Sequence, residues 1–259
     1  MIEAQAIAHW GRTHPWPTAE QVEQDLLLSR AICALADDPY LGTELVFRGG
    51  TAFHKLYLPR PYRYSEDLDY VRRTSGGIKP LTTALTDIGH SLGFEVRTRI
   101  TEHPKVYWRA RADSGVPLRI KIEVNTHELS PALPTVHRGL EVDSPWWSGV
   151  AQVQIFQLAE LVATKIRALY QRTKGRDLFD LWLALTQTDV DPKAVLEAFR
   201  PYRPQGLTSN LAVANLRRKL SDQQFQNDIA PLVAGQPSEY RIDTAADLVI
   251  DQLLTAIEP

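Results

Sequence analysis

The 259-residue sequence contains one cysteine and one methionine, and its longest apolar runs, such as residues 181–185, are far shorter than a membrane span. A single cysteine excludes an intramolecular disulfide and a zinc site built from several thiolates. We therefore interpret Cys33, which lies in the run Ile32-Cys33-Ala34-Leu35, as a small buried hydrophobic residue. No basic segment followed by an apolar segment opens the chain, so we expect a cytoplasmic protein with no membrane partner.

A strong charge of either sign is also lacking, since 29 basic and 31 acidic residues give a net charge of -2. This balance argues against a protein that coats nucleic acid. Positive charge is concentrated in residues 40–125, with 14 basic and 9 acidic side chains, and in residues 158–180, with 5 and 3. We expect these two segments to attract a polyanion such as a nucleotide, although scattered solvated arginines on strand faces would give the same counts.

Hydrophobic periodicity predicts an α+β protein with two parts. Residues 1–157 are expected to form a mixed sheet with flanking helices, and residues 158–259 a helical lobe. Within the first part the pattern predicts a capped helix over 18–36, a helix over 51–58, a helix over 80–92, and strands over 44–48, 67–71, 94–100, 106–111 and 118–124. Residues 126–149 read as an irregular connection, and 150–156 as an edge strand.

The tripeptide Gly49-Gly50-Thr51 lies between a predicted strand and a predicted helix. Two glycines at a helix start allow backbone N–H groups to face an anion, and the threonine can add a hydroxyl donor. This arrangement suits a phosphate, but a plain turn before a helix explains the same three residues.

Asp67 and Asp69 stand two residues apart on the next predicted strand, so both carboxylates point to the same side. Paired carboxylates are costly unless a cation neutralises them, and magnesium that holds nucleotide phosphates is a common solution. An exposed edge strand with solvated carboxylates is the alternative. Glu123, on the strand over 118–124, supplies a third carboxylate if that strand lies beside the aspartates, where it could polarise an incoming hydroxyl or complete a two-metal site.

The ordered set of motifs resembles the AbiEii/AbiGii nucleotidyltransferase-like toxins, a family that includes the mycobacterial MenT toxins. The resemblance covers about residues 20–190 and is carried by five segments: Phe47-Arg48-Gly49-Gly50-Thr51-Ala52-Phe53-His54-Lys55-Leu56, Arg63-Tyr64-Ser65-Glu66-Asp67-Leu68-Asp69, Ile120-Lys121-Ile122-Glu123-Val124, Ala163-Thr164-Lys165-Ile166-Arg167-Ala168-Leu169 and Arg176-Asp177-Leu178-Phe179-Asp180-Leu181. The spacing between Gly50 and Asp67 is longer than in the wider polymerase-beta superfamily but suits these toxins.

The resemblance implies a polymerase-beta-like nucleotidyltransferase fold and a toxin of a bacterial toxin–antitoxin or phage-defence system. It implies that Asp67 and Asp69 bind Mg²⁺, or Mn²⁺, and that Gly49, Gly50 and Thr51 contact the triphosphate. It further implies that Lys165 contacts phosphate and that Asp177 is an essential acid. Members of the MenT kind transfer a nucleotide from an NTP to the 3′ acceptor end of tRNA and thereby block aminoacylation, so tRNA and a cognate antitoxin are the expected partners.

The residues themselves leave alternatives open for several of these positions. Lys165 lies among apolar positions of a predicted helix and needs an anionic partner, which is either a triphosphate or a salt bridge to Asp177 or Asp180. Ser65 either binds nucleotide or is a turn residue. The basic candidates for a nucleic-acid surface are Arg48, Lys55, Arg60, Arg63, Arg109, Arg111, Lys121, Arg172, Lys174 and Arg176, and the aromatic candidates for base stacking are Tyr62, Tyr64, Tyr107 and Trp108.

A transferase acting on a protein or small molecule would use the same site, and a non-catalytic module that binds NTP or an antitoxin would share its residues.

Overall fold

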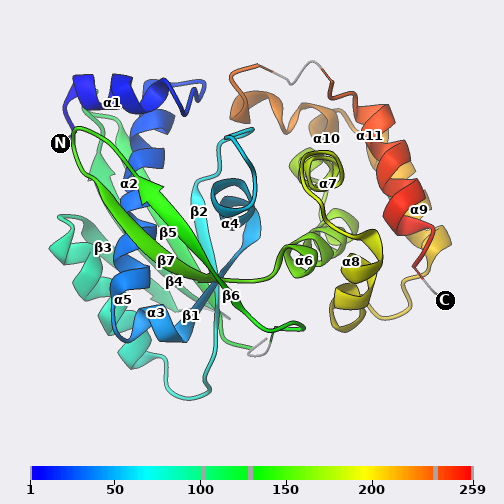
Figure 1. Ribbon diagram of the computed structural model, residues 1–259, viewed down its shortest axis with the longest axis horizontal. Coiled ribbons are helices and arrows are strands. Elements are labelled where there is room, and N and C mark those ends of the chain that lie inside the picture. Colours follow the sequence, from blue (N-terminus) through cyan, green and yellow to red (C-terminus); the bar gives the residue numbers. More distant parts are fainter. Residues whose placement is uncertain (1, 101–102, 128–130, 236–238, 258–259) are drawn as a thin grey trace. The chain divides into compact units, whose positions relative to one another are not determined.

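The computed structural model describes residues 2–100, 103–127, 131–235 and 239–257 (Figure 1). The chain divides into two compact units. The first, here called the sheet unit, comprises residues 1–56 and 64–156. The second, the helical unit, comprises residues 57–63 and 157–259. Residues 57–63 thus count with the helical unit although they precede a strand of the sheet in sequence.

The sheet unit is built on a seven-stranded mixed sheet with the order β3-β4-β5-β2-β1-β7-β6. Pairings β2–β5 and β1–β7 are parallel, and the other neighbours are antiparallel. The strands are β1 Leu45–Arg48, β2 Asp67–Arg72, β3 Glu95–Ile100, β4 Pro104–Arg111, β5 Pro117–Asn125, β6 Val136–Val142 and β7 Gly149–Ile155.

Two sequence-based expectations about this sheet were wrong, and one open alternative is excluded. β2 is central, so Asp67 and Asp69 do not lie on an exposed edge strand. β7 is internal rather than an edge, because β6 covers its outer side. β6 itself lies in the segment expected to be irregular, where only Leu140 and Val142 of the strand are buried, so no hydrophobic alternation marked it.

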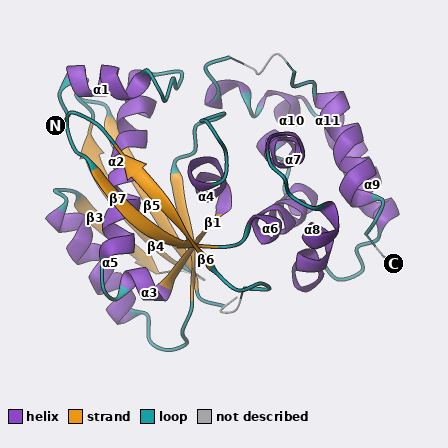
Figure 2. Cartoon of the chain, in the orientation of Figure 1, coloured by secondary structure: helices purple, strands orange, loops and turns teal. Residues whose placement is uncertain are grey.

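In the described part of the sheet unit, helices α1 to α5 accompany the sheet. They are drawn in purple in Figure 2. The longest begins at a capping box formed by Thr18 and Gln21, as the sequence predicted. This helix packs on β7 and β5, and α5 packs on β3 and β4 of the same sheet. The helices are α1 Ala4–Gly11, α2 Ala19–Asp37, α3 Leu41–Glu44, α4 Gly49–Leu56 and α5 Lys79–Ser91.

The helical unit packs around α6 and α7, which contact each other and the helices that follow. Leu161, Ile166, Leu178 and Leu181 are among its fully buried side chains. Its elements are α6 Leu158–Gln171, α7 Gly175–Gln187, α8 Pro192–Phe199, η1 Arg200–Tyr202, α9 Ser209–Leu220, α10 Gln223–Asn227, η2 Ala230–Leu232, α11 Ile242–Val249 and the π-helical turn η3 Ile250–Leu254.

Within the described ranges, no helix combines the length and the apolar character that crossing a membrane requires. Cys33 is buried in α2, as expected, and burial raises the pKa of its thiol to about 11.

Candidate functional site

Gly49 forms a sharp corner between β1 and α4. Its φ of +83° is a left-handed conformation that side-chain-bearing residues rarely adopt. A Cβ atom built on Gly49 would lie 2.7 Å from Asp69 Oδ2 and 3.1 Å from Asp69 Cβ. Glycine is therefore required here twice, for its backbone conformation and for the close approach of the Asp69 carboxylate.

Thr51, on the first turn of α4, is tied to the start of β2. Its Oγ1 lies 2.6 Å from the Asp67 carbonyl oxygen and 2.9 Å from Ser65 Oγ. Because a hydroxyl has one hydrogen and a carbonyl only accepts, Thr51 donates to Asp67 and accepts from Ser65. The two hydroxyls thus hold the strand that carries the aspartates, and the Thr51 side chain is 2% exposed.

Asp67 and Asp69 project from β2 beside two charged residues of the parallel neighbour β5. Asp67 pairs in register with Lys121, and Asp69 pairs with Glu123. Residues directly opposite on neighbouring strands share a face, so three carboxylates lie on one side of the sheet around the Lys121 ammonium group. Lys121 Nζ lies 2.9 Å from Asp67 Oδ2 and 3.3 Å from Glu123 Oε2, and Lys105 Nζ lies 3.4 Å from Glu123 Oε1.

The electrostatics of this patch leave Asp69 under-compensated. Burial raises the pKa of Asp69, the charges of Asp67 and Glu123 raise it further, and Lys121 and Arg48 only partly oppose them. Burial lowers the pKa of Lys121, but its contact with Asp67 and the nearby carboxylates outweigh burial and raise it overall. Among the described residues, none donates a hydrogen bond to the Asp69 carboxylate or pairs with that carboxylate within 4.0 Å.

These donors suit a hard divalent cation, because oxygen ligands on one face with a shortage of positive charge are what Mg²⁺ or Mn²⁺ requires. In the described part of the chain, no group of three or more His, Cys, Asp and Glu residues is close enough to hold a metal. The fit therefore rests on the pair Asp67 and Asp69. Glu123, on the neighbouring strand β5, forms ion pairs with Lys105 and Lys121.

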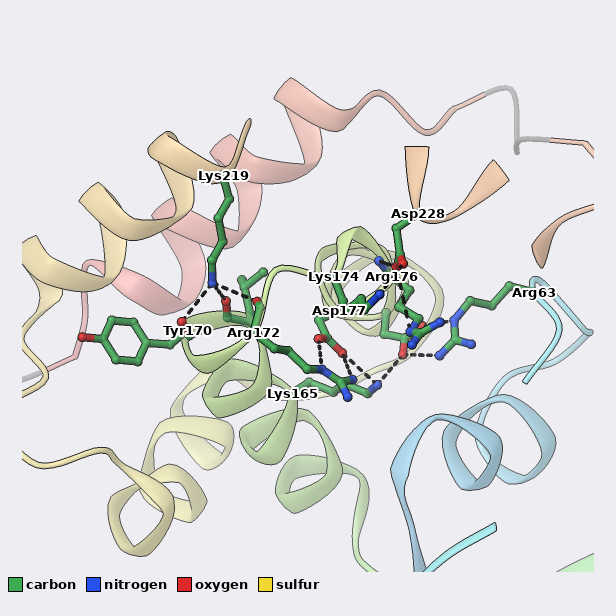
Figure 3. Close-up of polar contacts among 11 residues, drawn as sticks. Arg63, Lys165, Tyr170, Arg172, Lys174, Arg176, Asp177, Lys219 and Asp228 are labelled. Carbon is green, nitrogen blue, oxygen red and sulfur yellow. Dashed lines mark hydrogen bonds and ion pairs between the residues drawn. The ribbon is translucent and has the colours of Figure 1, made fainter. Parts of the chain in front are cut away.

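The helical unit contains a second charged cluster, formed where α6 packs on α7 (Figure 3). Lys165 Nζ lies 2.7 Å from Asp180 Oδ2 and 3.2 Å from Asp177 Oδ1. Both carboxylates are fully buried, and the Lys165 side chain is 10% exposed. The salt bridge that the sequence left open as an alternative for Lys165 is thus present, to both acids at once.

Two arginines complete this cluster. Arg63 donates from Nε and Nη2 to the two oxygens of Asp180, at 2.7 Å each, and Arg172 donates to Asp177 at 2.6 and 2.7 Å. Burial raises the pKa of Asp177, but Lys165 and Arg172 outweigh burial and hold it below its usual range. The two buried carboxylates thus bridge three cations, which come from α6, from the residue that caps its C-terminal end and from the segment before β2.

The structure thus places the predicted site residues in two groups. Gly49, Gly50, Thr51, Ser65, Asp67, Asp69, Lys121 and Glu123 lie in the sheet unit, and Arg63, Lys165, Asp177 and Arg176 lie in the helical unit. Arg48 ends β1 directly opposite Asp69, with its guanidinium 5.6 Å from the centre of the Phe156 ring. The proposal that Asp67, Asp69, Lys165 and Asp177 serve one reaction stays a prediction.

Several residues expected to contact nucleic acid have protein partners. Lys121 pairs with the carboxylates, Lys55 with buried Asp25 at 2.8 Å, and Arg176 lies 3.8 Å from Asp228. Tyr62, Tyr64 and Trp108 are buried, which leaves Tyr107 as the half-buried aromatic candidate. Lys105 was missed, because only the register of β4 on β5 brings it to Glu123.

Comparisons with known proteins bear on this arrangement. The sequence profile of the nucleotidyl transferase AbiEii toxin family, of type IV toxin–antitoxin systems, matches residues 30–248. The structure is similar to MenT4, a nucleotidyltransferase toxin from Mycobacterium tuberculosis H37Rv, with a TM-score of 0.66, 18% identity, and coverage of 97% of this chain and 88% of that one. A weaker likeness, with a TM-score of 0.44, 18% identity and coverage of 94% and 96%, is to an antigenic nucleotidyltransferase-like protein from Paracoccidioides brasiliensis.

A search of curated proteins returned no match. The likeness to MenT4 supports the fold, and the fold class predicted from the sequence is confirmed. Because the family profile spans most of the chain, from before β1 to the end of α11, the protein belongs to the AbiEii family of nucleotidyltransferase toxins.

Proposed function

We propose that this toxin transfers a nucleoside monophosphate from an NTP to a hydroxyl at the 3′ acceptor end of tRNA and so blocks translation. The observation that carries the proposal is the contact between Gly49 and Asp69, in which a glycine corner and a carboxylate pair from the central strand meet. Membership of the family supports nucleotidyl transfer, an NTP substrate and an antitoxin partner.

Asp67 and Asp69 would hold the divalent cation, Mg²⁺ or Mn²⁺, since they share a face and Asp69 lacks a compensating partner among the described residues. When bound, such an ion neutralises negative charge on the phosphates. At the start of α4, beside Gly49 and Gly50, the backbone N–H groups and the positive end of the helix dipole would attract a phosphate. Thr51 and Ser65 keep β2 in place rather than offering free hydroxyls.

In the proposed reaction, the acceptor hydroxyl oxygen forms a bond to the α-phosphorus of the NTP. The bond from that phosphorus to the bridging oxygen breaks, and pyrophosphate leaves with the electron pair. We assign Glu123 the role of accepting the hydroxyl proton, because it stands directly opposite Asp69 on the neighbouring strand.

Lys165 is proposed to contact the nucleotide phosphates, and Asp177 to orient it. Asp177 and Asp180 hold the Lys165 ammonium group at 3.2 and 2.7 Å, which supports this role because the group that would meet a phosphate has a fixed position. Replacing Lys165 with methionine should then raise KM for NTP.

The function is tested by incubating the protein with each of the four NTPs, labelled at the α-phosphate, together with Mg²⁺ and total tRNA. Label in the RNA is the predicted result. Label in protein would instead indicate a protein acceptor, and NTP binding without any labelling would indicate a non-catalytic module. Asp67→Asn should abolish the transfer, whereas Asp87→Asn, an exposed aspartate on α5, should leave it unchanged.

A further inference from the structure

The face of the sheet that carries Asp67 and Asp69 continues over β5, β4 and β3. Side chains alternate along β4 and β5, where Val106, Trp108, Ile120 and Ile122 are buried on the opposite face. Trp108 Nε1 donates to the Leu85 carbonyl of α5 at 3.1 Å, so the helices cover that opposite face. The odd-numbered residues of the three strands therefore form the face that continues from the carboxylates.

This odd-numbered face is strongly basic. We call it the basic platform, and the register places Arg97 and Arg99 of β3, Lys105, Tyr107, Arg109 and Arg111 of β4, and Arg119 and Lys121 of β5 on it, with Glu95 and Glu123 as its acids. Seven cations thus face two anions. Arg97, Arg99, Arg111 and Arg119 are exposed, and Lys105, Arg109 and Lys121 are half-buried.

Two like-charge pairs stand directly opposite each other on this platform. Arg109 pairs in register with Arg119, and Arg99 pairs with Lys105. Like charges at directly opposed positions destabilise an antiparallel pair. A bound polyanion would relieve both repulsions if its phosphates lay between the two cations of each pair. The platform therefore favours a negatively charged ligand.

Tyr107 sits in the middle of the platform, between Arg97 on one side and Lys121 on the other. The Arg119 guanidinium lies 5.4 Å from the centre of its ring. A half-buried aromatic ring flanked by guanidinium groups is the combination on which an unpaired base stacks while its phosphates are neutralised.

The platform is hollowed at the N-terminal end of β5. A groove of about 760 Å³ is lined by residues that include Arg109, Arg111, Arg119, Glu66 and Glu95. Glu66 directly precedes Asp67, so the groove reaches the start of the strand that carries the carboxylates.

We propose that the basic platform binds the single-stranded acceptor segment of an RNA, with phosphates on Arg109 and Arg119, a base on Tyr107, and the 3′ end at Asp67 and Asp69. The placement of the 3′ end rests on the proposed function. A single strand is favoured over a duplex because stacking on Tyr107 requires an unpaired base. An acidic protein segment is the competing occupant and is included as an outcome below.

The test measures binding of a fluorescein-labelled 12-nucleotide RNA ending in CCA, in EDTA, so that neither metal nor catalysis contributes. Arg109→Ala/Arg119→Ala should weaken binding at least tenfold and make the slope of log K against log salt shallower by about 1.4, because two phosphate contacts are lost at about 0.7 each. Arg217→Ala/Arg218→Ala removes two exposed arginines from α9 and should change neither quantity.

Stability provides a second readout of the like-charge pair. The double variant removes the Arg109–Arg119 repulsion and also the opposite-charge pair of Arg109 with Glu95, so its melting temperature should stay close to that of the wild type, which separates a binding defect from misfolding. Tyr107→Leu should weaken binding about 5- to 150-fold, the value of one stacked base, whereas Tyr107→Phe should retain it.

Two results would overturn the proposal: binding by the Arg109/Arg119 variant equal to that of the wild type, or competition by a polyglutamate 12-mer as effective as unlabelled RNA. A duplex RNA that binds as tightly as the single strand would also refute it. The proposed function is tested separately, since Asp67→Asn should abolish transfer, whereas its binding of the 12-mer should still depend on Arg109 and Arg119. RNA binding that depends on Arg109 and Arg119, in a protein that labels no RNA, would leave the platform standing and reject nucleotidyl transfer.

Discussion

Gly49→Ala should reduce activity more than it reduces stability, because the added Cβ atom would displace the Asp69 carboxylate. An alanine held at φ +83° costs about 1–2 kcal/mol relative to glycine. Contact with Asp69 adds an overpacking cost of about 1–3 kcal/mol. The 2.7 Å contact is with Asp69 Oδ2, which can rotate away. The 3.1 Å contact with Asp69 Cβ is relieved only by moving β2. Because only this milder contact remains, the added cost should fall in the lower half of that range.

Gly93→Ala is the matched control, because Gly93 has a φ of +86° and nothing lies within 4 Å of a Cβ placed there. Both variants are compared by thermal unfolding followed by circular dichroism. Each kcal/mol lowers the melting temperature of a chain of this size by roughly 2–4 °C, so Gly49→Ala should melt several degrees below Gly93→Ala. Activity should diverge more, with a loss of about 100-fold in Gly49→Ala, because the rotated carboxylate leaves its metal-binding position.

A double-mutant cycle isolates the contact itself. Adding Asp69→Gly to Gly49→Ala should recover about 1 kcal/mol relative to the sum of the single changes, because the Asp69 Cβ atom and carboxylate that oppose the new methyl group are both removed. Equal melting temperatures for Gly49→Ala and Gly93→Ala, or strict additivity in the cycle, would refute the inference that Gly49 is required for the approach of Asp69.

Three further predictions concern charged groups. Asp69→Asn should raise the melting temperature by a few degrees at pH 7 while abolishing transfer. The reason is that the pKa of Asp69 is raised in the folded protein, so the ionised carboxylate costs stability at pH 7. Measured by unfolding at several pH values, the gain in stability should shrink as the pH falls towards 3.8, the ordinary pKa of an aspartate. An equal gain at pH 3 and pH 7 would contradict this assignment. Asp180→Ala should destabilise the protein by about 3–5 kcal/mol in urea titrations, because it removes the carboxylate paired with buried Arg63, whereas Asp228→Ala, whose partners are 33–36% exposed, should cost no more than about 1 kcal/mol. Lys219 donates to the carbonyls of Leu169, Tyr170 and Arg172, and burial lowers its pKa to about 8. Between pH 8 and 10.5 the unfolded chain therefore binds more protons than the folded protein does. The wild type should gain stability as the pH rises through that window, and Lys219→Met should not.

Much of the fold could be predicted from the sequence wherever a periodic pattern or a capping residue marks an element. Helix α2 begins at Thr18, and β5 shows the strict alternation of Leu118, Ile120, Ile122 and Val124. The strand β6 could not be found, because it lies at the sheet edge with most of its side chains exposed. Edge strands carry little hydrophobic signal, and only their pairing defines them.

The candidate site divides in the same way between local and non-local information. The spacing of Asp67 and Asp69 predicts that both side chains share a face, and the glycine pair predicts where the chain turns sharply. The pairing of β2 with β5, which sets Lys121 and Glu123 against the aspartates, depends on which strands become neighbours. Sequence spacing contains no such information, so the pairing of Lys121 with Asp67 and Glu123 could not be predicted.

The central claim is that Asp67 and Asp69 bind the catalytic cation, and manganese binding measured by electron paramagnetic resonance tests it without requiring activity. The wild type, titrated with Mn²⁺ in the presence of a non-hydrolysable NTP analogue, should show a saturable bound fraction. Asp67→Asn and Asp69→Asn should each weaken that binding at least tenfold, and Asp87→Asn should not change it. Undiminished Mn²⁺ binding in both site variants would contradict the claim.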